Sequence, residues 1–460
     1  MKDYISKIHF VGIGGVGMAG IAEVCFNLGY SVSGSDIKMN PTVFRLNSLG
    51  IDIQIGHAAE QVKTCDVVVV STAIAEGNPE VDFAREMRIP IIPRAAMLAE
   101  LMRLRFGIAI SGTHGKTTTT SLTAAILTQA GLDPTFVIGG KLKQVGANAR
   151  LGSSKYLIAE ADESDASFLH LSPMMSVVTN IDQDHMETYQ GDYQVLENTF
   201  IEFIHRLPFY GMAILCIDDI NVQNILPKLS RKIFTYGFNE QADVRAFNVK
   251  VDGLLMHFSV QAFDQPAFQV TLAQPGEHNV QNALAAITVA LELDVSVEDI
   301  QTALGSFKGV GRRFEVYPNR LIGGKNVTLV DDYGHHPVEL EATLKTAKNA
   351  FPGKRIVLVF QPHRYSRTRD LFDDFVQVLM KPDLLILTEV YPAGETPLVA
   401  FDSKALLQSL RLLGRKESIH AESFESLESL AENVLMDDDV VLIMGAGDIG
   451  HFAKKWHGND

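Results

Sequence analysis

Apolar segments that run into glycine-rich turns, each followed by a helical segment, recur along this sequence of 460 residues. Lys7–Val11 runs into Gly12, and Phe106–Ser111 runs into Gly112. Strands that alternate with helical segments form a parallel sheet, because a parallel connection needs a long crossover and the crossover helices cover both faces of the sheet. The sequence therefore predicts an α/β fold.

The second of these turns carries the most specific motif in the chain. Residues 112–118 read Gly-Thr-His-Gly-Lys-Thr-Thr and open a predicted helix over 116–130. Glycines let backbone N–H groups approach phosphate oxygens, and the start of a helix adds positive potential. In such a loop Lys116 spans the β- and γ-phosphates of a nucleotide, and the Thr117 hydroxyl binds Mg²⁺. We therefore predict that the chain binds Mg²⁺-ATP here.

This loop is shorter than the usual GxxxxGK[ST] pattern, because Ile110 occupies the position of the first glycine. The alternative is a plain turn between a strand and a helix. A Gly-Lys pair followed by four threonines, directly after an apolar strand, favours the phosphate loop over that alternative.

An earlier turn, residues 12–17, reads Gly-Ile-Gly-Gly-Val-Gly and also follows a strand. Asp36 lies nineteen residues after Gly17, at the end of the next predicted strand. The glycine turn suits a diphosphate at a helix start, and the acid suits a ribose hydroxyl. This pattern fits a nicotinamide cofactor or any other diphosphate-linked ribose, so an NAD-dependent dehydrogenase stays an alternative. We interpret a similar turn at 445–450, which has no acid at the right offset, as structural.

Acidic residues follow two further predicted strands. Glu160 ends one strand and begins the run Glu-Ala-Asp-Glu-Ser-Asp, and residues 180–187 after the next strand include His185. Carboxylates just past the ends of parallel strands, beside a phosphate loop, are placed to hold a divalent metal. A neutral imidazole with oxygen ligands suits a second ion. The alternative is a pair of solvated acidic loops.

A predicted helix over 278–293 begins with two amide side chains, Asn279 and Asn282. Their spacing of three residues puts them on one helix face, where they could bind the polar edge of adenine. Capping of the helix by Asn279 is the alternative. Farther along the chain, Arg313 offers a guanidinium group for phosphate.

Two loops in the last third of the chain follow apolar strands. Residues 331–337 read Asp-Asp-Tyr-Gly-His-His-Pro, and residues 360–367 read Phe-Gln-Pro-His-Arg-Tyr-Ser-Arg. Arg364 and Arg367 lie three residues apart in a loop, so they could bind a carboxylate by two-point hydrogen bonds. The adjacent histidines, of which His335 is the first, suit proton transfer near neutral pH.

Composition narrows the class of partner. With 40 Lys and Arg residues against 55 Asp and Glu residues, the formal net charge is −15, and no Lys/Arg-rich block occurs. Such a chain is not expected to bind nucleic acid or anionic membranes. Three widely spaced cysteines form no disulfide or zinc pattern. Because no apolar run approaches the roughly 18 residues of a membrane span and residues 1–4 show no signal-peptide pattern, we expect a cytoplasmic protein.

These motifs occur in the order seen in the Mur ligases, the ATP-dependent amide-forming enzymes of peptidoglycan synthesis. The chain resembles that family over essentially its whole length. The motifs that carry the resemblance are Gly112-x-x-Gly115-Lys116-Thr117, the Glu160 strand end, Asn180 with Asp184-His185, His278-Asn279-x-x-Asn282, Gly311-Arg312-Arg313 and the loop over 331–337.

The resemblance implies three domains. These are a Rossmann-like N-terminal domain for a UDP-sugar over residues 1–106, a central P-loop ATPase-like domain over 107–317 and a Rossmann-like C-terminal domain for an amino acid over 318–460. Several relatives carry a carbamylated lysine near a second metal. That feature is not expected here, because no lysine lies between residues 156 and 227. For the oligomeric state, we expect a monomer or a homodimer.

The resemblance also implies a reaction and its substrates. ATP with Mg²⁺ would activate the lactyl carboxylate of UDP-N-acetylmuramate as an acyl phosphate, and L-alanine would capture that intermediate. A recycling ligase of the same family, which attaches a tripeptide to the same nucleotide sugar, stays an alternative.

Roles for individual residues follow from the same resemblance. The UDP-sugar is expected at Gly12, Gly14, Gly15, Gly17, Ser35 and Asp36. ATP is expected at Gly112, Thr113, His114, Gly115, Lys116, Thr117, Thr118, Asn279 and Asn282. Metal ions are expected at Thr117, Glu160 and His185. The amino acid is expected at Tyr333, Arg364 and Arg367. The catalytic residues are expected to be Lys116, His185, Arg313 and His335, with His335 assisting loss of the amine proton.

Overall fold

The computed structural model describes residues 4–71, 73–398, 400–415 and 417–458, so residues 1–3, used above to judge the N-terminus, lie outside the described part. The chain forms two compact units. The first comprises Met1–Phe247, Ser259–Val270 and Gln281–Phe307, and the second comprises Asn248–Phe258, Thr271–Val280 and Lys308–Asp460. None of the described helices is both long enough and apolar enough to span a lipid bilayer.

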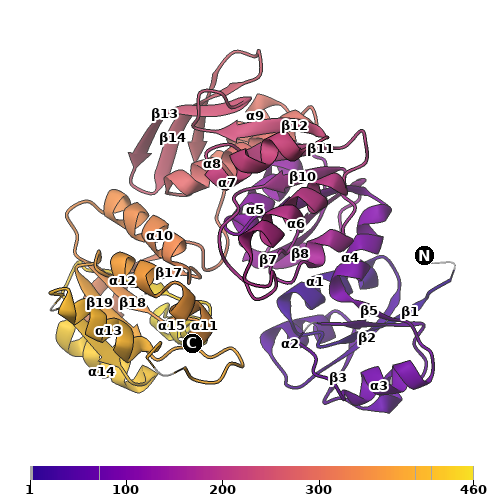
Figure 1. The fold of residues 1–460 in the computed structure, drawn as a ribbon, viewed down its shortest axis with the longest axis horizontal. Coiled ribbons are helices and arrows are strands. Elements are labelled where there is room, and N and C mark those ends of the chain that lie inside the picture. The colour runs from indigo at the N-terminus through magenta and orange to yellow at the C-terminus, as the bar shows by residue number, and fades with distance from the viewer. Residues whose placement is uncertain (1–3, 72, 399, 416, 459–460) are drawn as a thin grey trace. The chain divides into compact units, whose positions relative to one another are not determined.

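The N-terminal part of the first unit is built on a five-stranded sheet in the order β3-β2-β1-β4-β5, with every adjacent pair parallel (Figure 1). The strand order reverses between β1 and β4, and ligands of such sheets bind where the carboxyl ends of the strands flank this reversal. The elements are β1 (Lys7–Val11), α1 (Val16–Asn27), β2 (Ser31–Asp36), α2 (Pro41–Ser48), β3 (Asp52–Ile55), η1 (Ala59–Val62), β4 (Val67–Val70), α3 (Pro79–Glu86), β5 (Ile91–Pro93) and α4 (Arg94–Arg103).

A second sheet has ten strands in the order β15-β14-β13-β12-β11-β10-β6-β9-β7-β8. Its strands are β6 (Phe106–Ser111), β7 (Thr135–Leu142), β8 (Ala147–Arg150), β9 (Tyr156–Glu160), β10 (Met175–Val178), β11 (Met212–Cys216), β12 (Lys232–Gly237), β13 (Val244–Asp252), β14 (Leu255–Ala262) and β15 (Phe268–Leu272). Its helices are α5 (Lys116–Gln129), η2 (Ser167–His170), α6 (Tyr193–His205), α7 (Ile220–Ile225), η3 (Leu226–Lys228), α8 (Glu277–Leu291) and α9 (Val297–Gly305). Strand β6, which leads into the phosphate loop, is flanked by β9 and β10 in parallel, so the acidic strand ends lie beside that loop.

Helix α5 is buried on all sides over its first three turns. Several of its polar side chains tolerate this burial because they are hydrogen-bonded. The hydroxyls of Thr120, Ser121 and Thr123 donate to the backbone carbonyls four residues earlier. The run of threonines therefore fits a helix enclosed by the core.

Helix α1 of the first sheet packs against the hairpin β7–β8 of the second. An added Cβ at Gly20 would lie 3.0 Å from Ala149 and 3.2 Å from Val137, so a larger residue would require these side chains to shift by a few tenths of an ångström. Arg45 of α2, which pairs with Glu23 of α1 at 2.8 Å, also donates from Nη2 to Asn148 Oδ1 of β8 at 3.4 Å. Within the first unit, the two glycine-rich loops therefore belong to sheets that are packed directly together.

The third sheet has six strands in the order β16-β17-β21-β18-β19-β20. Strand β16 pairs antiparallel with β17, and the other pairs are parallel. The elements are β16 (Glu315–Ile322), β17 (Lys325–Asp332), α10 (Pro337–Ala350), β18 (Ile356–Phe360), α11 (Tyr365–Asp370), α12 (Phe372–Leu379), β19 (Leu384–Thr388), α13 (Ser403–Leu412), β20 (Ser418–Ala421), α14 (Phe424–Val434), β21 (Val440–Met444) and α15 (Ile449–Trp456).

The three sheets agree with the predicted α/β fold class, but the predicted domain boundary near residue 318 falls inside β16. This strand is an edge strand whose residues are mostly half-buried or exposed. It therefore lacks the apolar run that marks a buried strand in a sequence. A boundary before Glu315 suits the structure better.

Candidate functional site

The phosphate loop has the backbone geometry that its glycines predict. Gly112 and Gly115 have φ angles of +123° and +86°, a region that favours glycine. An added Cβ would lie 2.1 Å from the Thr179 hydroxyl at Gly112, and 2.4 Å from the Asn282 side-chain oxygen at Gly115. Both glycines are therefore required by the left-handed backbone and by the close approach of neighbouring side chains.

The end of strand β10 holds this loop in place. Asn180 accepts hydrogen bonds from the Thr113 N–H through its carbonyl at 3.2 Å and from the His114 N–H through its side chain at 2.8 Å. The Thr179 hydroxyl donates to the His114 carbonyl at 2.6 Å. The loop is thus preorganised by hydrogen bonds from a neighbouring strand.

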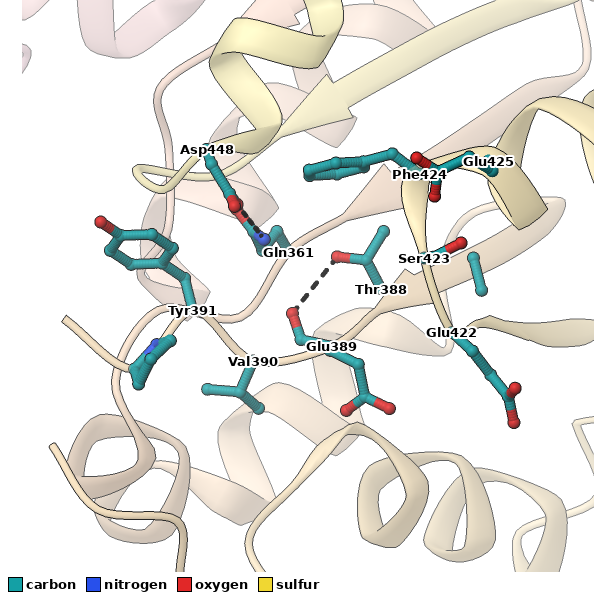
Figure 2. A pocket seen from close by; sticks show the side chains of 12 residues that line it. Gln361, Thr388, Glu389, Val390, Tyr391, Glu422, Ser423, Phe424, Glu425 and Asp448 are labelled. Atoms are coloured by element: carbon teal, nitrogen blue, oxygen red, sulfur yellow. Dashed lines mark hydrogen bonds between the residues drawn. The ribbon is translucent and has the colours of Figure 1, made fainter. Parts of the chain in front are cut away.

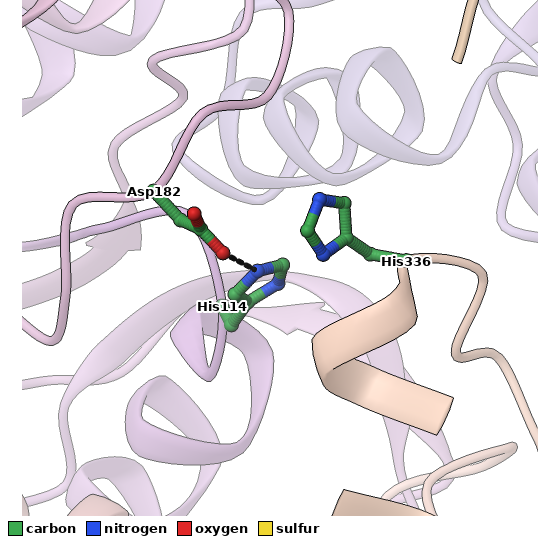
Figure 3. Close-up of side chains that lie close together, drawn as sticks. All are labelled: His114, Asp182 and His336. Carbon is green, nitrogen blue, oxygen red and sulfur yellow. Dashed lines mark hydrogen bonds and ion pairs between the residues drawn. The ribbon is translucent and has the colours of Figure 1, made fainter. Parts of the chain in front are cut away.

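Figure 3 shows the His114 ring directed toward the Asp182 carboxylate, with His114 Nε2 and Asp182 Oδ2 3.2 Å apart. The Asp182 backbone N–H also donates to the Thr113 hydroxyl at 2.8 Å. The acidic loop after β10 therefore contacts two of the predicted ATP-binding residues. His336, also drawn in Figure 3, belongs to the second unit, where it caps helix α10.

Lys116 lies among oxygen atoms. Its Nζ donates to the carbonyls of Gly112 at 2.7 Å and Thr113 at 3.1 Å, and to Glu163 Oε1 at 2.8 Å. Burial favours the neutral amine, but the carboxylates of Glu163, Asp162 and Glu160 outweigh that effect and raise the pKa of Lys116. The lysine is therefore a fixed positive charge at the centre of the loop.

Glu163 is the partner of Lys116, and no role of its own was predicted for it. Its side chain is buried, and burial raises its pKa to about 7, although the nearby Lys116 acts in the opposite direction. The Tyr189 hydroxyl donates to the Glu163 carbonyl and so ties this turn to the end of the acidic loop. The acidic run after β9 was a signal for this residue, because Glu163 follows Glu160 by three positions.

Two of the predicted metal ligands, Thr117 and Glu160, lie close to Lys116. Glu160 ends β9, and its Oε1 accepts a hydrogen bond from the Gly139 N–H at 2.6 Å. Thr117 lies in the first turn of α5 beside Thr118, and both are nearly buried. His185 has a φ of +53° and its Nε2 lies 3.5 Å from Asp184 Oδ2. Such strained conformations are concentrated at functional sites.

The two amides of helix α8 differ in their contacts. Asn282 accepts a hydrogen bond from the Thr119 hydroxyl at 3.2 Å and lies against Gly115, so it supports the phosphate loop. The Asn279 side-chain NH₂ donates to the Pro275 carbonyl at 2.7 Å. Binding of adenine by these amides stays a prediction.

The first glycine loop is fixed from the end of β2. The backbone N–H groups of Gly12 and Ile13 donate to the Ser35 carbonyl, and the Gly14 N–H donates to Asp36 Oδ2 at 2.8 Å. Asp36 thus lies at the loop, where it was predicted. An added Cβ at Gly14 would lie 2.7 Å from the same Asp36 oxygen.

The side chain of Ser35 points into the protein. It is fully buried, and its hydroxyl donates to Glu80 Oε2 at 2.6 Å. His57 Nδ1 lies 3.1 Å from the same carboxylate oxygen. The hydroxyl of Ser35 is therefore engaged inside the protein while its carbonyl holds the loop. A role of Ser35 in binding a UDP-sugar stays a prediction.

In the second unit, Asp332 joins the two loops that carry Arg313 and Tyr333. Its carboxylate accepts hydrogen bonds from the N–H groups of Phe314 and Gly334, both at 2.7 Å. Burial raises the pKa of Asp332 to about 6, with Arg313 opposing the change. The guanidinium carbon of Arg313 lies 5.1 Å from the centre of the Tyr333 ring, so these two predicted residues are in contact.

His335 and Arg367 meet at His363. The rings of His335 and His363 are 5.5 Å apart, and Arg367 Nη1 lies 3.2 Å from His363 Nδ1. Arg367 is nearly buried. Arg364 has a φ of +71°, and its N–H donates to the Tyr391 carbonyl at 2.9 Å. The structure therefore brings the predicted amino-acid residues to the ends of β17 and β18, with His363 as an additional member.

A cavity of about 260 Å³ lies in the second unit, next to these loops. Figure 2 shows the side chains that line it. Gln361 Nε2 donates to Asp448 Oδ1 at 2.6 Å at one side of it, and its described lining includes Glu389, Glu422 and Glu425. The predicted residues Tyr333, Arg364 and Arg367 are not among the described residues that line it. An acidic lining repels a carboxylate, so this cavity does not serve the predicted carboxylate grip.

The fold and the site together are those of a nucleotide-dependent enzyme with a phosphate loop and a second, separate glycine-rich loop. Three family descriptions match the chain in order: "Mur ligase family, catalytic domain" over residues 7–106, "Mur ligase middle domain" over 110–290 and "Mur ligase, glutamate ligase domain" over 312–447. The chain belongs to the Mur ligase family, which confirms the predicted resemblance.

Individual relatives agree with this assignment. The chain is 75% identical to a UDP-N-acetylmuramate–L-alanine ligase of Hydrogenovibrio crunogenus over 99% of both chains, and 60% identical to one of Neisseria gonorrhoeae over 98% of this chain and 97% of that one. Among solved structures, UDP-N-acetylmuramate-alanine ligase of Thermotoga maritima matches with a TM-score of 0.82 at 30% identity, and a murein peptide ligase of Psychrobacter arcticus with 0.73 at 25%, each covering 98% of both chains.

The close contact at Gly115 predicts an effect on nucleotide binding. In Gly115→Ala the new Cβ would meet Asn282, whereas in Gly131→Ala, at a φ of +72°, it would meet nothing within 4 Å. Both variants strain the backbone at a positive φ, so the difference between their stabilities measures the effect of the contact with Asn282. We expect Gly115→Ala to lower the free energy of unfolding by about 1–3 kcal/mol more than Gly131→Ala, and to weaken binding of a non-hydrolysable ATP analogue at least tenfold by calorimetry. Equal behaviour of the two variants would contradict this account of the loop.

The raised pKa of Glu163 predicts a pH-dependent stability. The folded state binds this proton more tightly than the unfolded state, whose pKa is near 4.5, so Glu163 lowers the free energy of unfolding as the pH rises from 4.5 to about 7. The free energy of unfolding of Glu163→Gln, taken relative to that of the parent, should therefore rise by about 1–3 kcal/mol from pH 5 to pH 8. Denaturant unfolding of the protein without nucleotide or metal measures this, with the exposed Glu187→Gln as the control for loss of a carboxylate. A fall in this relative free energy of unfolding over the same pH range would show that Lys116 dominates the titration of Glu163.

Proposed function

We propose that this chain is an ATP-dependent ligase that joins L-alanine to the lactyl carboxylate of UDP-N-acetylmuramate, a step in making peptidoglycan precursors. The observation that carries the proposal is the preorganised phosphate loop, in which Lys116 lies among the carboxylates of Glu160, Asp162 and Glu163. The proposal is supported by relatives named UDP-N-acetylmuramate–L-alanine ligase, which are up to 75% identical to this chain over nearly its whole length. We place the reaction in the cytoplasm, where ATP is available, and expect a monomer or a homodimer.

The reaction has two steps. A lactyl carboxylate oxygen attacks the γ-phosphorus of ATP, so that ADP leaves and an acyl phosphate forms. The amine of alanine then attacks the acyl carbon, the bond from that carbon to the bridging oxygen breaks, and phosphate leaves. The protein contributes mainly by positioning the reactants and neutralising charge. Lys116 supplies positive charge beside the transferred phosphoryl group once its hydrogen bonds to the loop carbonyls give way to phosphate oxygens.

The residues around Lys116 fit a magnesium ion. Carboxylate and hydroxyl oxygens are the ligands that Mg²⁺ prefers, and Glu160 and Thr117 offer one of each. Within the described residues, the Thr117 hydroxyl makes no hydrogen bond, whereas Thr120 and Thr123 of the same helix donate theirs to carbonyls. Thr117 and Glu160 would hold the ion, with His185 near a second one. A bound Mg²⁺ would neutralise the charge of the phosphate oxygens.

The C-terminal residues suit the amino acid. Arg364 and Arg367 would bind the alanine carboxylate, with Tyr333 beside it, and His335 would accept a proton from the alanine ammonium group before attack. Arg313 would neutralise phosphate charge near Tyr333. His363 adds a positioning role, because it contacts both the His335 ring and the Arg367 guanidinium.

A substrate panel tests this function. Steady-state ADP release over many turnovers should require UDP-N-acetylmuramate and an amino acid together. L-alanine should be best, L-serine and glycine poorer, and D-alanine rejected, because one methylene is worth only about 1–3 kcal/mol in a pocket. Lys116→Ala is the control for contaminating ATPases and should lose about 3 kcal/mol or more of transition-state stabilisation. Faster turnover with a cell-wall tripeptide would establish the recycling ligase instead. Tight NAD(H) binding without ADP release would establish a dehydrogenase.

Arg367→Lys tests the carboxylate grip. An ammonium cannot reproduce the planar two-point hydrogen bonds of a guanidinium, so the KM for alanine should rise at least tenfold while the KM for ATP stays within twofold. Arg369→Lys, in the same helix but exposed and paired with Asp370, is the matched control. An unchanged KM for alanine in Arg367→Lys would remove this residue from the amino-acid site.

A further inference from the structure

Arg94 lies at the first glycine loop, although no motif of the sequence points to it. It is the first residue of helix α4, directly after strand β5. An added Cβ at Gly17 would lie 2.5 Å from Arg94 Nη1, so the guanidinium group lies against the backbone of this glycine. Gly17 is the last glycine of the loop over 12–17. The missing side chain at Gly17 therefore leaves room for an arginine, in addition to any ligand.

The other terminal nitrogen of the same guanidinium faces the acidic turn that lies beside the phosphate loop. Arg94 Nη2 lies 3.5 Å from Asp162 Oδ2. Asp162 is followed directly by Glu163, the carboxylate that accepts a hydrogen bond from Lys116. Arg94 therefore stands between the glycine loop and the turn that contacts the lysine of the phosphate loop.

The pair between Arg94 and Asp162 is too weak to explain this placement by its contribution to stability. Both side chains are partly exposed, at 28% and 38%, and an ion pair of this kind at 3.5 Å adds little to folding. Within the described residues, Asp162 is the charged partner of Arg94. The Nη1 side of the guanidinium faces the loop with its hydrogen-bonding capacity available, and a guanidinium fork matches the oxygens of a phosphate group.

We propose that Arg94 binds the diphosphate of a nucleoside diphosphate held on the loop over residues 12–17, and that Asp162 acts as a positioning residue that orients Arg94. The proposal rests on the proposed function, because it takes the nucleotide sugar as the ligand of this loop. It also gives the loop a charge that backbone N–H groups alone do not supply. Since Asp162 and Glu163 are adjacent, the same turn sets the position of Arg94 at one site and of Lys116 at the other.

Binding measurements without catalysis test this assignment. The probes are UDP and uridine, and calorimetry on the full chain without ATP gives their affinities. Arg94→Gln should weaken UDP binding at least tenfold and leave uridine binding within twofold, because uridine has no diphosphate. Arg94→Lys should fall between the parent and Arg94→Gln. The matched control is Arg103→Gln, at the exposed end of the same helix, which should bind UDP as the parent does.

Asp162→Asn separates the positioning role from direct contact. It should weaken UDP binding less than Arg94→Gln does, and the double variant should match Arg94→Gln alone, because Asp162 acts through the arginine. Equal losses of UDP and uridine in Arg94→Gln would show a merely structural role and overturn the proposal. Unchanged UDP affinity in Arg94→Gln would also overturn it and leave the proposed function intact, whereas failure of the parent to bind UDP or UDP-N-acetylmuramate would overturn the proposed function itself.

Discussion

The hydrogen bonds of Lys116 are the interaction on which the rest of the active region depends. Its ammonium group contacts two loop carbonyls and the buried Glu163, and these contacts require the left-handed backbone at Gly112 and Gly115. A buried charge is tolerated only when it is paired and hydrogen-bonded. The carboxylates that satisfy this lysine also create the oxygen-rich surroundings that a magnesium nucleotide needs. The same carboxylates therefore hold the lysine in place and offer ligands for a metal ion.

The parallel sheet brings these groups together because the carboxyl ends of its neighbouring strands lie side by side. Strand β6 leads into the phosphate loop, β9 ends in Glu160, and β10 leads into Asn180 and Asp182. Each strand end contributes one element of the site: the loop, the acidic turn or the side chains that fix the loop. The first sheet repeats this arrangement at the glycine loop over residues 12–17, where the end of β2 supplies Asp36. Because α1 packs on the β7–β8 hairpin, the two loops belong to one packed unit.

The sequence allowed prediction of features that depend on neighbouring residues. The strands Lys7–Val11 and Phe106–Ser111 lie where they were predicted, since each is an apolar run bounded by a turn, and Glu160 ends a strand as predicted. The phosphate loop and the first glycine loop were recognisable for the same reason. These motifs combine strand, turn and helix start within a few residues, so local chemistry determines them.

Features that depend on distant residues were not predictable from the sequence. Ser35 lies next to Asp36, yet its side chain faces Glu80 inside the protein, and only the fold shows which way it points. Strand β16 is half exposed and has no apolar run. The contacts of Arg94 with Gly17 and Asp162 join parts of the chain that no spacing rule connects.

The central claim is that this site phosphorylates a carboxylate before the amide bond forms. The most direct measurement uses UDP-N-acetylmuramate labelled with ¹⁸O in both oxygens of its lactyl carboxylate, with ATP, Mg²⁺ and L-alanine. If an acyl phosphate forms, the oxygen that attacks the γ-phosphorus leaves with it, so each released phosphate should carry one ¹⁸O atom by mass spectrometry. Unlabelled phosphate, released together with the amide product, would contradict the account.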